Sequence, residues 1–123
     1  MNCENKQLAD MKKEKKFEED CPISRALFII SGKWSLRLVS EIGIEKKRFG
    51  ELKKGIEEIS EKMLIQELKL LTENGILEKE VHNQIPPKVE YYLTDLGLQL
   101  LPLLDHIKNF GTNLIQQTPF SHN

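Results

Sequence analysis

Cysteines and long apolar runs are both scarce in this chain, and each shortage excludes a class of protein. The 123 residues include only two cysteines, Cys3 and Cys21. Two cysteines cannot build a disulfide framework, so free thiols are expected. The longest uninterrupted apolar stretch covers residues 26–30, far short of the ~18 residues that span a bilayer. The first twenty residues hold no apolar segment of the secretory kind, so we expect a cytoplasmic protein with no membrane partner.

An excess of charge of one sign is also missing. The formal net charge is −1, with 39% hydrophobic and 30% charged residues, which is an ordinary composition for one globular domain. Residues 21–59 carry eight Lys or Arg against five acids, a local surplus of +3. This surplus is only weak evidence for a nucleic-acid-binding surface. The sequence pI is about 6.3, whereas the domains of strong nucleic-acid binders have a pI above about 9. Composition alone leaves the function open.

Motifs for catalysis and for cofactor binding are absent from the sequence. It contains no glycine-rich phosphate loop, no zinc-protease helix motif and no nucleophile elbow. The three histidines, His82, His106 and His122, are far apart and have no cysteine or carboxylate at the spacing of metal ligands. We therefore predict no enzyme activity, no metal site and no cofactor.

Apolar spacing predicts helices through the first part of the chain. Residues 1–20 form a charged arm in which apolar residues are too sparse for a stable helix. Helices are expected over residues 22–30 and 33–42, and a short third one is marked by Phe49, Leu52 and Ile56 with Arg48 at its entry. Ser60 is a good N-cap for a fourth helix that ends at Asn74-Gly75. Glu67 lies inside the apolar arc of this helix without an evident reason.

After Gly75 the apolar period changes from 3.6 to 2, which predicts two strands. The strands cover residues 76–82 and 88–93, and residues 83–87, with the stiff pair Pro86-Pro87, join them into a hairpin. Thr94 then caps a last helix. Pro102 is expected to kink that helix, because it removes the hydrogen bond to the carbonyl of Leu98.

Two apolar edges run along the last helix. The first steps by four and three residues through Leu96, Leu100, Leu103, Ile107, Phe110 and Leu114, and the second holds Leu101, Leu104 and Ile115. A single contact with the domain's own core does not bury both edges, so the excess predicts a partner helix. The candidate dimerisation residues are Leu100, Leu103, Ile107, Phe110 and Leu114.

The order of these elements predicts a mainly α fold with a small β-hairpin (α+β), namely a winged helix-turn-helix with a long C-terminal dimerisation helix. The domain is expected over residues 21–118, with the dimerisation helix at 94–118 and a short tail at 119–123. In such modules the second helix of the pair lies in the major groove of double-stranded DNA. We predict a DNA-binding surface made of Arg48, Ser60, Lys62, Ile65, Gln66, Lys69 and Lys88.

A polar stripe on an amphipathic helix is also compatible with a merely solvated face. The alternative function is a winged-helix module that binds another protein and not operator DNA. Such a module would expose apolar residues on the stripe, where Ile65 is the only one. Gln can pair with adenine and Lys with guanine or phosphate, so Lys62, Gln66 and Lys69 favour DNA.

Several ordered motifs resemble the HxlR-type family of bacterial transcriptional regulators, relatives of the MarR winged-helix proteins. They cover about residues 21–111 and comprise Cys21-Pro22, Gly32-Lys33-Trp34, Arg48-Phe49, Glu51-Leu52, Ile59-Ser60, Lys62-Met63-Leu64, Pro86-Pro87, Val89-Glu90-Tyr91, Leu93-Thr94, Gly97, Leu100 and Pro102. The family usually has Trp where this chain has Phe110. The resemblance implies a homodimer that binds operator DNA.

Cys21 is a candidate redox sensor for a small reactive effector. It directly precedes Pro22, so its sulfur is expected at a helix N-terminus, where the dipole favours the thiolate. The resemblance implies the same role, because some family members use the cysteine of this Cys-Pro pair to sense oxidants or electrophiles. A small residue that fills space at the helix start is the alternative interpretation.

Overall fold

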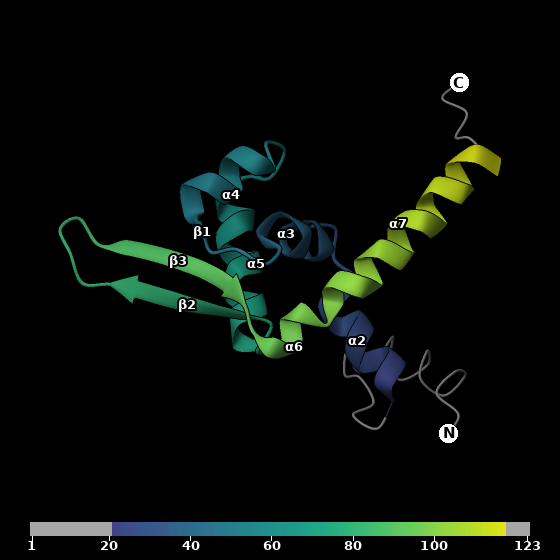
Figure 1. Ribbon diagram of the computed structural model, residues 1–123, viewed down its shortest axis with the longest axis horizontal. Coiled ribbons are helices and arrows are strands. Elements are labelled where there is room, and N and C mark those ends of the chain that lie inside the picture. The colour runs from purple at the N-terminus through teal and green to yellow at the C-terminus, as the bar shows by residue number, and fades with distance from the viewer. Residues whose placement is uncertain (1–20, 118–123) are drawn as a thin grey trace.

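The structure, a computed structural model, describes residues 21–117 of the chain. The predicted arm (1–20), which includes Cys3, and the predicted tail (119–123) lie outside these residues. The elements in chain order are α2 (Pro22–Ile30), α3 (Ser35–Ile42), β1 (Lys47–Arg48), α4 (Phe49–Gly55), α5 (Glu61–Glu73), β2 (Leu77–His82), β3 (Lys88–Leu93), α6 (Asp95–Leu98) and α7 (Leu100–Gln117), shown in Figure 1. The winged helix-turn-helix with a long C-terminal helix is confirmed.

Two predicted N-caps are present. The Ser60 hydroxyl accepts a hydrogen bond of 3.0 Å from the backbone N–H of Met63 at the start of α5. The Thr94 hydroxyl accepts one of 3.0 Å from the N–H of Gly97 at the start of α6. Both caps satisfy backbone donors that the first turn of a helix leaves without partners. At the other end of α5 the chain turns into β2 through Gly75, whose φ of 77° suits glycine.

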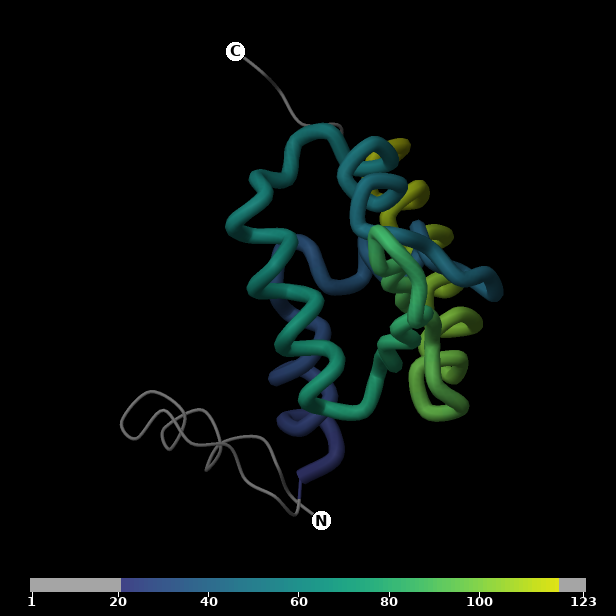
Figure 2. The backbone as a smooth tube through the Cα atoms, turned by 90° about the vertical axis from the view of Figure 1, so that its left-hand side faces the viewer, coloured from purple at the N-terminus to yellow at the C-terminus, as the bar shows by residue number. Residues whose placement is uncertain are grey.

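The core lies where α3, α4 and α5 meet the sheet. Its fully buried side chains come from each of these elements and include Leu38, Val39 and Ile42 of α3, Leu52 of α4, Leu64, Leu68 and Leu71 of α5, and Leu77 of β2. The ribbon and the backbone tube both show α3 between α5 and α7 (Figures 1 and 2). The hairpin and α7 extend from the core in opposite directions (Figure 1).

A third strand joins the predicted hairpin. The sheet is antiparallel with the order β1-β3-β2, and Arg48 of β1 lies opposite Glu90 of β3. Sequence reasoning placed Arg48 only at a helix entry and missed the strand, because two residues are too short to show a period of two. Its formation attaches the start of α4 to the middle of β3.

The predicted C-terminal helix is divided at Gln99 into α6 and α7. Pro102 has no N–H for the carbonyl of Leu98, and it sits in the first turn of α7, where a missing donor costs little. The expected kink is therefore a break. The α6 end is held tightly, because a Cβ at Gly97 would collide with the carbonyl oxygen of Ile76. In the part of the chain that the structure describes, no helix has the length and apolar character to cross a membrane.

Candidate nucleic-acid interface

The second helix of the helix-turn-helix, α5, has two chemically distinct faces. Leu64, Leu68 and Leu71 are at most 2% exposed and point into the core. Lys62, Gln66 and Lys69 are all exposed, as predicted, and their spacing places them together on the face opposite the core. The structure thus presents three long polar side chains on one side of a rigid helix.

Ser60 has a positional role at the start of this helix. Its hydroxyl is engaged with the N–H of Met63, and Glu61 and Lys62 follow in the first turn. A capped N-terminus concentrates positive potential from the helix dipole, which attracts phosphate. Lys62 therefore lies in the first turn of α5, where the helix dipole most favours a phosphate group of a nucleic-acid backbone.

Arg48 lies at the N-terminus of the neighbouring helix α4. Its backbone N–H donates a hydrogen bond of 2.8 Å to Oε1 of Glu51, while the residue as a whole is exposed. Its pairing with β3 fixes its backbone in the sheet. An exposed guanidinium on such an anchored backbone is suited to a phosphate contact.

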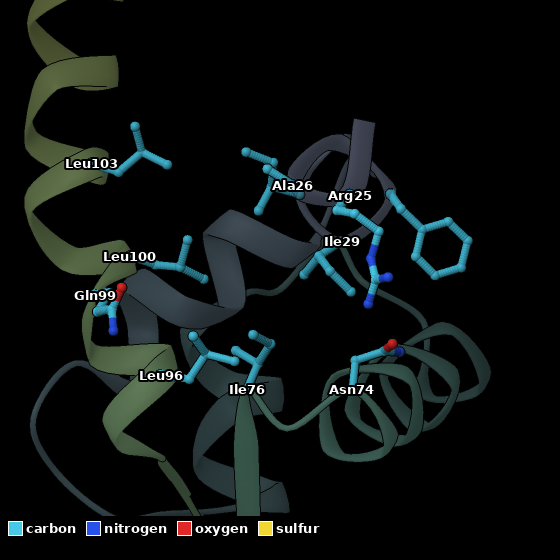
Figure 3. Close-up of a pocket in the computed structure, with 11 residues that line it drawn as sticks. Arg25, Ala26, Ile29, Asn74, Ile76, Leu96, Gln99, Leu100 and Leu103 are labelled. Carbon is cyan, nitrogen blue, oxygen red and sulfur yellow. The ribbon is translucent and has the colours of Figure 1, made fainter. Parts of the chain in front are cut away.

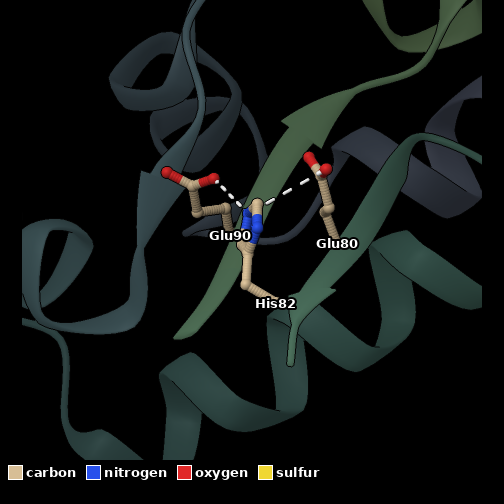
Figure 4. Close-up of side chains that lie close together, drawn as sticks. All are labelled: Glu80, His82 and Glu90. Atoms are coloured by element: carbon tan, nitrogen blue, oxygen red, sulfur yellow. Dashed lines mark hydrogen bonds and ion pairs between the residues drawn. The ribbon is translucent and has the colours of Figure 1, made fainter. Parts of the chain in front are cut away.

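The last predicted contact residue, Lys88, is partly neutralised. Its Nζ lies 3.7 Å from Oε2 of Glu90, and its side chain is 30% exposed. Glu90 also lies 2.9 Å from Nε2 of His82, and Oε2 of Glu80 is 3.9 Å from the same nitrogen (Figure 4). The hydrogen bond with His82 lowers the pKa of the Glu90 carboxyl. Lys88 thus belongs to an ion-pair network at the wing.

Sequence reasoning missed this grouping of Glu80, His82 and Glu90. Residues 80 and 82 alternate along β2 and so share a face, and Glu90 lies directly opposite Glu80 in β3. The period-two pattern contained that signal. The possible ligand atoms of the three lie within 4.8 Å of one another. Lys46, 2.6 Å from Glu80, lowers the pKa of that carboxyl through its hydrogen bond, and together with Lys88 it balances the acids, so ion pairing accounts for the group.

Two further cations, Lys33 just before α3 and Arg37 within it, lie near the segment that leads into α5. The Lys33 ammonium lies 4.9 Å and the Arg37 guanidinium 5.0 Å from the ring centre of Trp34. Arg37 also forms an ion pair of 3.1 Å with Glu58, in the turn that precedes Ser60. These contacts tie α3 to the approach of α5 and add to the positive surplus of residues 21–59.

Glu67 faces inward, on the side of α5 next to the α2–α3 turn. Its Oε1 is buried and has no hydrogen-bond partner among the described residues. Burial raises the pKa of this carboxyl. Glu67, whose place in the apolar arc the sequence did not explain, is thus a buried polar group without a hydrogen bond to another described residue on the inner side of α5.

The apolar surface of the molecule lies on α2 and α7, away from α5. Leu103, Ile107, Phe110 and Leu114 are 37%, 39%, 64% and 49% exposed, whereas Leu104 is buried at 7%. Of the five predicted dimerisation residues, Leu100 packs partly against the chain's own core. A hollow of about 430 Å³ continues this surface between α2 and the start of α7, lined mainly by apolar side chains such as Ala26, Ile29 and Leu103 (Figure 3).

Cys21 differs from the expectation of a free thiol. It is the N-cap residue of α2, with Pro22 in the first turn, but its side chain makes no capping hydrogen bond. It is 2% exposed and is disulfide-bonded in the structure. The free thiolate predicted at this helix start is therefore wrong for the state described here, because the sulfur is held in a covalent bond.

Comparison with known proteins agrees with this geometry. A profile of HxlR-like helix-turn-helix proteins matches residues 29–119. The chain is 42% identical to the HTH-type transcriptional regulator YdeP of Bacillus subtilis strain 168, over 76% of this chain and 73% of YdeP. A MarR-family transcriptional regulator of Porphyromonas gingivalis W83 superposes with a TM-score of 0.73 at 44% identity, over 79% and 95% of the two chains. The redox regulator HypR in its oxidized form gives a TM-score of 0.71 at 39% identity, over 76% and 96%.

Proposed function

Because this chain belongs to the HxlR-like helix-turn-helix family of transcriptional regulators, we propose that it binds operator DNA as a homodimer. The observation that carries the proposal is the two-faced helix α5, whose apolar side is fully buried and whose opposite side exposes Lys62, Gln66 and Lys69. In a helix-turn-helix the second helix reads base edges with its N-terminal residues. We expect the protein to act in the cytoplasm, where the DNA of a bacterial cell lies.

The side chains divide into two roles by their chemistry. Gln66 can form two hydrogen bonds with adenine, and Lys62 and Lys69 can donate to guanine or to phosphate. Arg48, at the junction of β1 and α4, is suited to a backbone phosphate, which positions the protein without reading sequence. Lys88 contributes less, because Glu90 already balances part of its charge.

The homodimer is supported by the exposed apolar residues of α7. A twofold axis through this helix would present two copies of α5 to one side of a duplex. We therefore expect a pseudo-palindromic operator with half-sites about 34–36 Å apart, or a multiple of that distance. The rival function, a protein-binding winged helix, is less favoured because Ile65 is the only large apolar side chain exposed on α5, a helix that the structure describes completely.

Selection of bound duplexes from a random-sequence pool, followed by titration of variants, tests this function. Lys62→Ala or Gln66→Ala should cost roughly 1–3 kcal/mol on the selected duplex and relax specificity at one base pair. Arg48→Ala should weaken all duplexes alike and flatten the salt dependence by about one unit. Lys108→Ala removes a lysine from α7 and should leave the pattern of base preference unchanged. Failure to select any sequence, or equal binding by all variants, would contradict the proposal.

We also infer that Cys21 makes this binding responsive to thiol chemistry. The support is its disulfide-bonded state beside the start of α2 and the similarity to HypR, whose structures include oxidized and reduced forms. Opening the disulfide would release the start of α2, a helix whose residues Ala26 and Ile29 line the hollow beside α7. Operator affinity should then differ between dithiothreitol-treated and diamide-treated protein, and Cys21→Ser should remove that difference. Equal affinity in both states would leave Cys21 with a packing role only.

A further inference from the structure

Ile65 is an apolar side chain in a polar setting. It is 55% exposed, and it lies one turn after Lys62 and one turn before Lys69 on α5. Residues three and four positions apart on a helix are neighbours on its surface, so Ile65 adjoins the polar stripe. Single exposed apolar residues are common on proteins, so exposure alone assigns no role to Ile65.

The surroundings of Ile65 distinguish it from the other exposed apolar residues. The exposed leucines and aromatics of α2 and α7 gather into one apolar surface, and Ile85 is at the tip of the wing. Ile65 instead borders a shallow hollow of about 360 Å³ between α5 and the sheet, together with Phe49, Lys69, Thr72 and Tyr91. The hollow has an apolar wall, and its lining also includes the charged residues Lys69, Glu73 and Lys79, so it can receive a small apolar group next to a polar one.

The major groove of DNA offers one such apolar group. Among the base edges only thymine carries a methyl group, at C5, next to the O4 acceptor. An isoleucine placed at guanine, adenine or cytosine would leave hydrogen-bonding groups of the base without partners, which is costly. Contact between Ile65 and a thymine methyl would remove apolar surface from water on both sides.

We propose that Ile65 is a specificity-determining residue that selects thymine in each operator half-site by packing against its 5-methyl group. This inference rests on the proposed function, because it assigns one base to a helix already proposed to read DNA. The selected thymine would be adjacent to the base pairs that Lys62 and Gln66 read, since those side chains flank Ile65 on α5.

The test uses the full chain and the duplex obtained by selection from a random pool. Each thymine of one half-site is replaced in turn by deoxyuridine, which lacks only the methyl group. One position should weaken the wild-type protein by about fourfold, the effect of losing one buried methyl contact. Ile65→Ala should bind the thymine and deoxyuridine duplexes equally well at that position, because its shortened side chain no longer reaches the methyl group.

Matched controls separate the possible failures. Ile44→Ala truncates another exposed isoleucine, 86% exposed in the loop before β1, and should keep the fourfold difference. Thermal unfolding should be nearly unchanged in Ile65→Ala, because most of the removed surface is already in water. The inference is overturned if no thymine position responds to deoxyuridine, or if Ile65→Ala keeps the full response. Absence of any selected sequence would instead reject the proposed function.

Discussion

The helices α5 and α7 carry similar apolar stripes but bury them to very different extents. The inner residues of α5, Leu64, Leu68 and Leu71, are at most 2% exposed, whereas four residues of the α7 seam are 37–64% exposed. Both stripes show helical spacing in the sequence. The difference shows that an amphipathic pattern reveals which face of a helix must be buried. It does not reveal whether the same chain or another molecule buries that face.

Position in the fold explains this difference. The apolar residues of α5 belong to one buried cluster with residues of α3, α4 and the sheet, so its apolar face is covered by several elements of the same domain. Within the described residues, α7 packs against the core near its start, through Leu100, Leu101 and Leu104, and then extends away from it (Figure 1). The other described residues do not cover this part of α7, and a second copy of the chain is the cover that we propose.

Charge on the α7 seam should produce the largest effect. Ile107→Asp and Phe110→Asp should prevent dimerisation, because each would bury an unpaired carboxylate in the interface. Sedimentation should then shift from twice 14.3 kDa to the monomer mass, and operator affinity should fall about 10²–10⁴-fold with the loss of bivalent binding. Thr112→Asp, on the same helix but off the seam, is the control. A wild-type chain that sediments as a stable monomer at micromolar concentration would contradict the dimer.

Truncation of one leucine on each helix sharpens the comparison. Leu68→Ala should lower the free energy of unfolding by roughly 2–5 kcal/mol, because it leaves a cavity in the core. Leu114→Ala should act mainly on association, so its effect on the melting temperature should depend on protein concentration. Thermal unfolding at several concentrations measures both. Equal concentration dependence in the two variants would mean that the stripes do not differ in the way proposed.

The smallest effect is expected at Glu67, the polar exception on the inner side of α5. Burial raises the pKa of its carboxyl, so the folded chain holds this proton more tightly than the unfolded chain does. The charged carboxylate therefore destabilises the fold at neutral pH, and this penalty vanishes below the unfolded pKa of about 4.3.

Glu67→Gln should accordingly raise the melting temperature slightly at pH 7 and leave it unchanged near pH 4. Glu73→Gln, at an exposed position of the same helix, serves as the control for the change in net charge. An increase of the same size at both pH values would show that the benefit does not come from removing a buried charge.

Local signals were sufficient to predict most of the fold. Ser60 and Thr94 were recognisable as caps because their chemistry acts within three residues. The hairpin followed from its period of two. The strand β1 could not be predicted in this way, because its two residues are held by pairing with β3, which is distant in sequence.

The surface features of the candidate site were predictable to a similar degree. The exposed polar face of α5 follows from helical spacing and is present as expected. The contact of Lys88 with Glu90, and the grouping of Glu80 with His82, depend on strand register across the hairpin. The disulfide-bonded state of Cys21 is not specified by the local sequence pattern, from which a free thiol was expected.

The break at Gln99 has a mechanical consequence. On its near side α6 is locked to the end of α5, because the Thr94 hydroxyl lies 2.6 Å from the carbonyl of Gly75 and Gly97 abuts Ile76. On its far side α7 is a rod of 18 residues, about 27 Å long at 1.5 Å per residue. A tilt of about 10° at this joint would move the tip of the rod by about 5 Å. In the dimer that we propose, substitutions around Gln99 would therefore change the distance between the two copies of α5 without altering α5 itself or the apolar seam of α7.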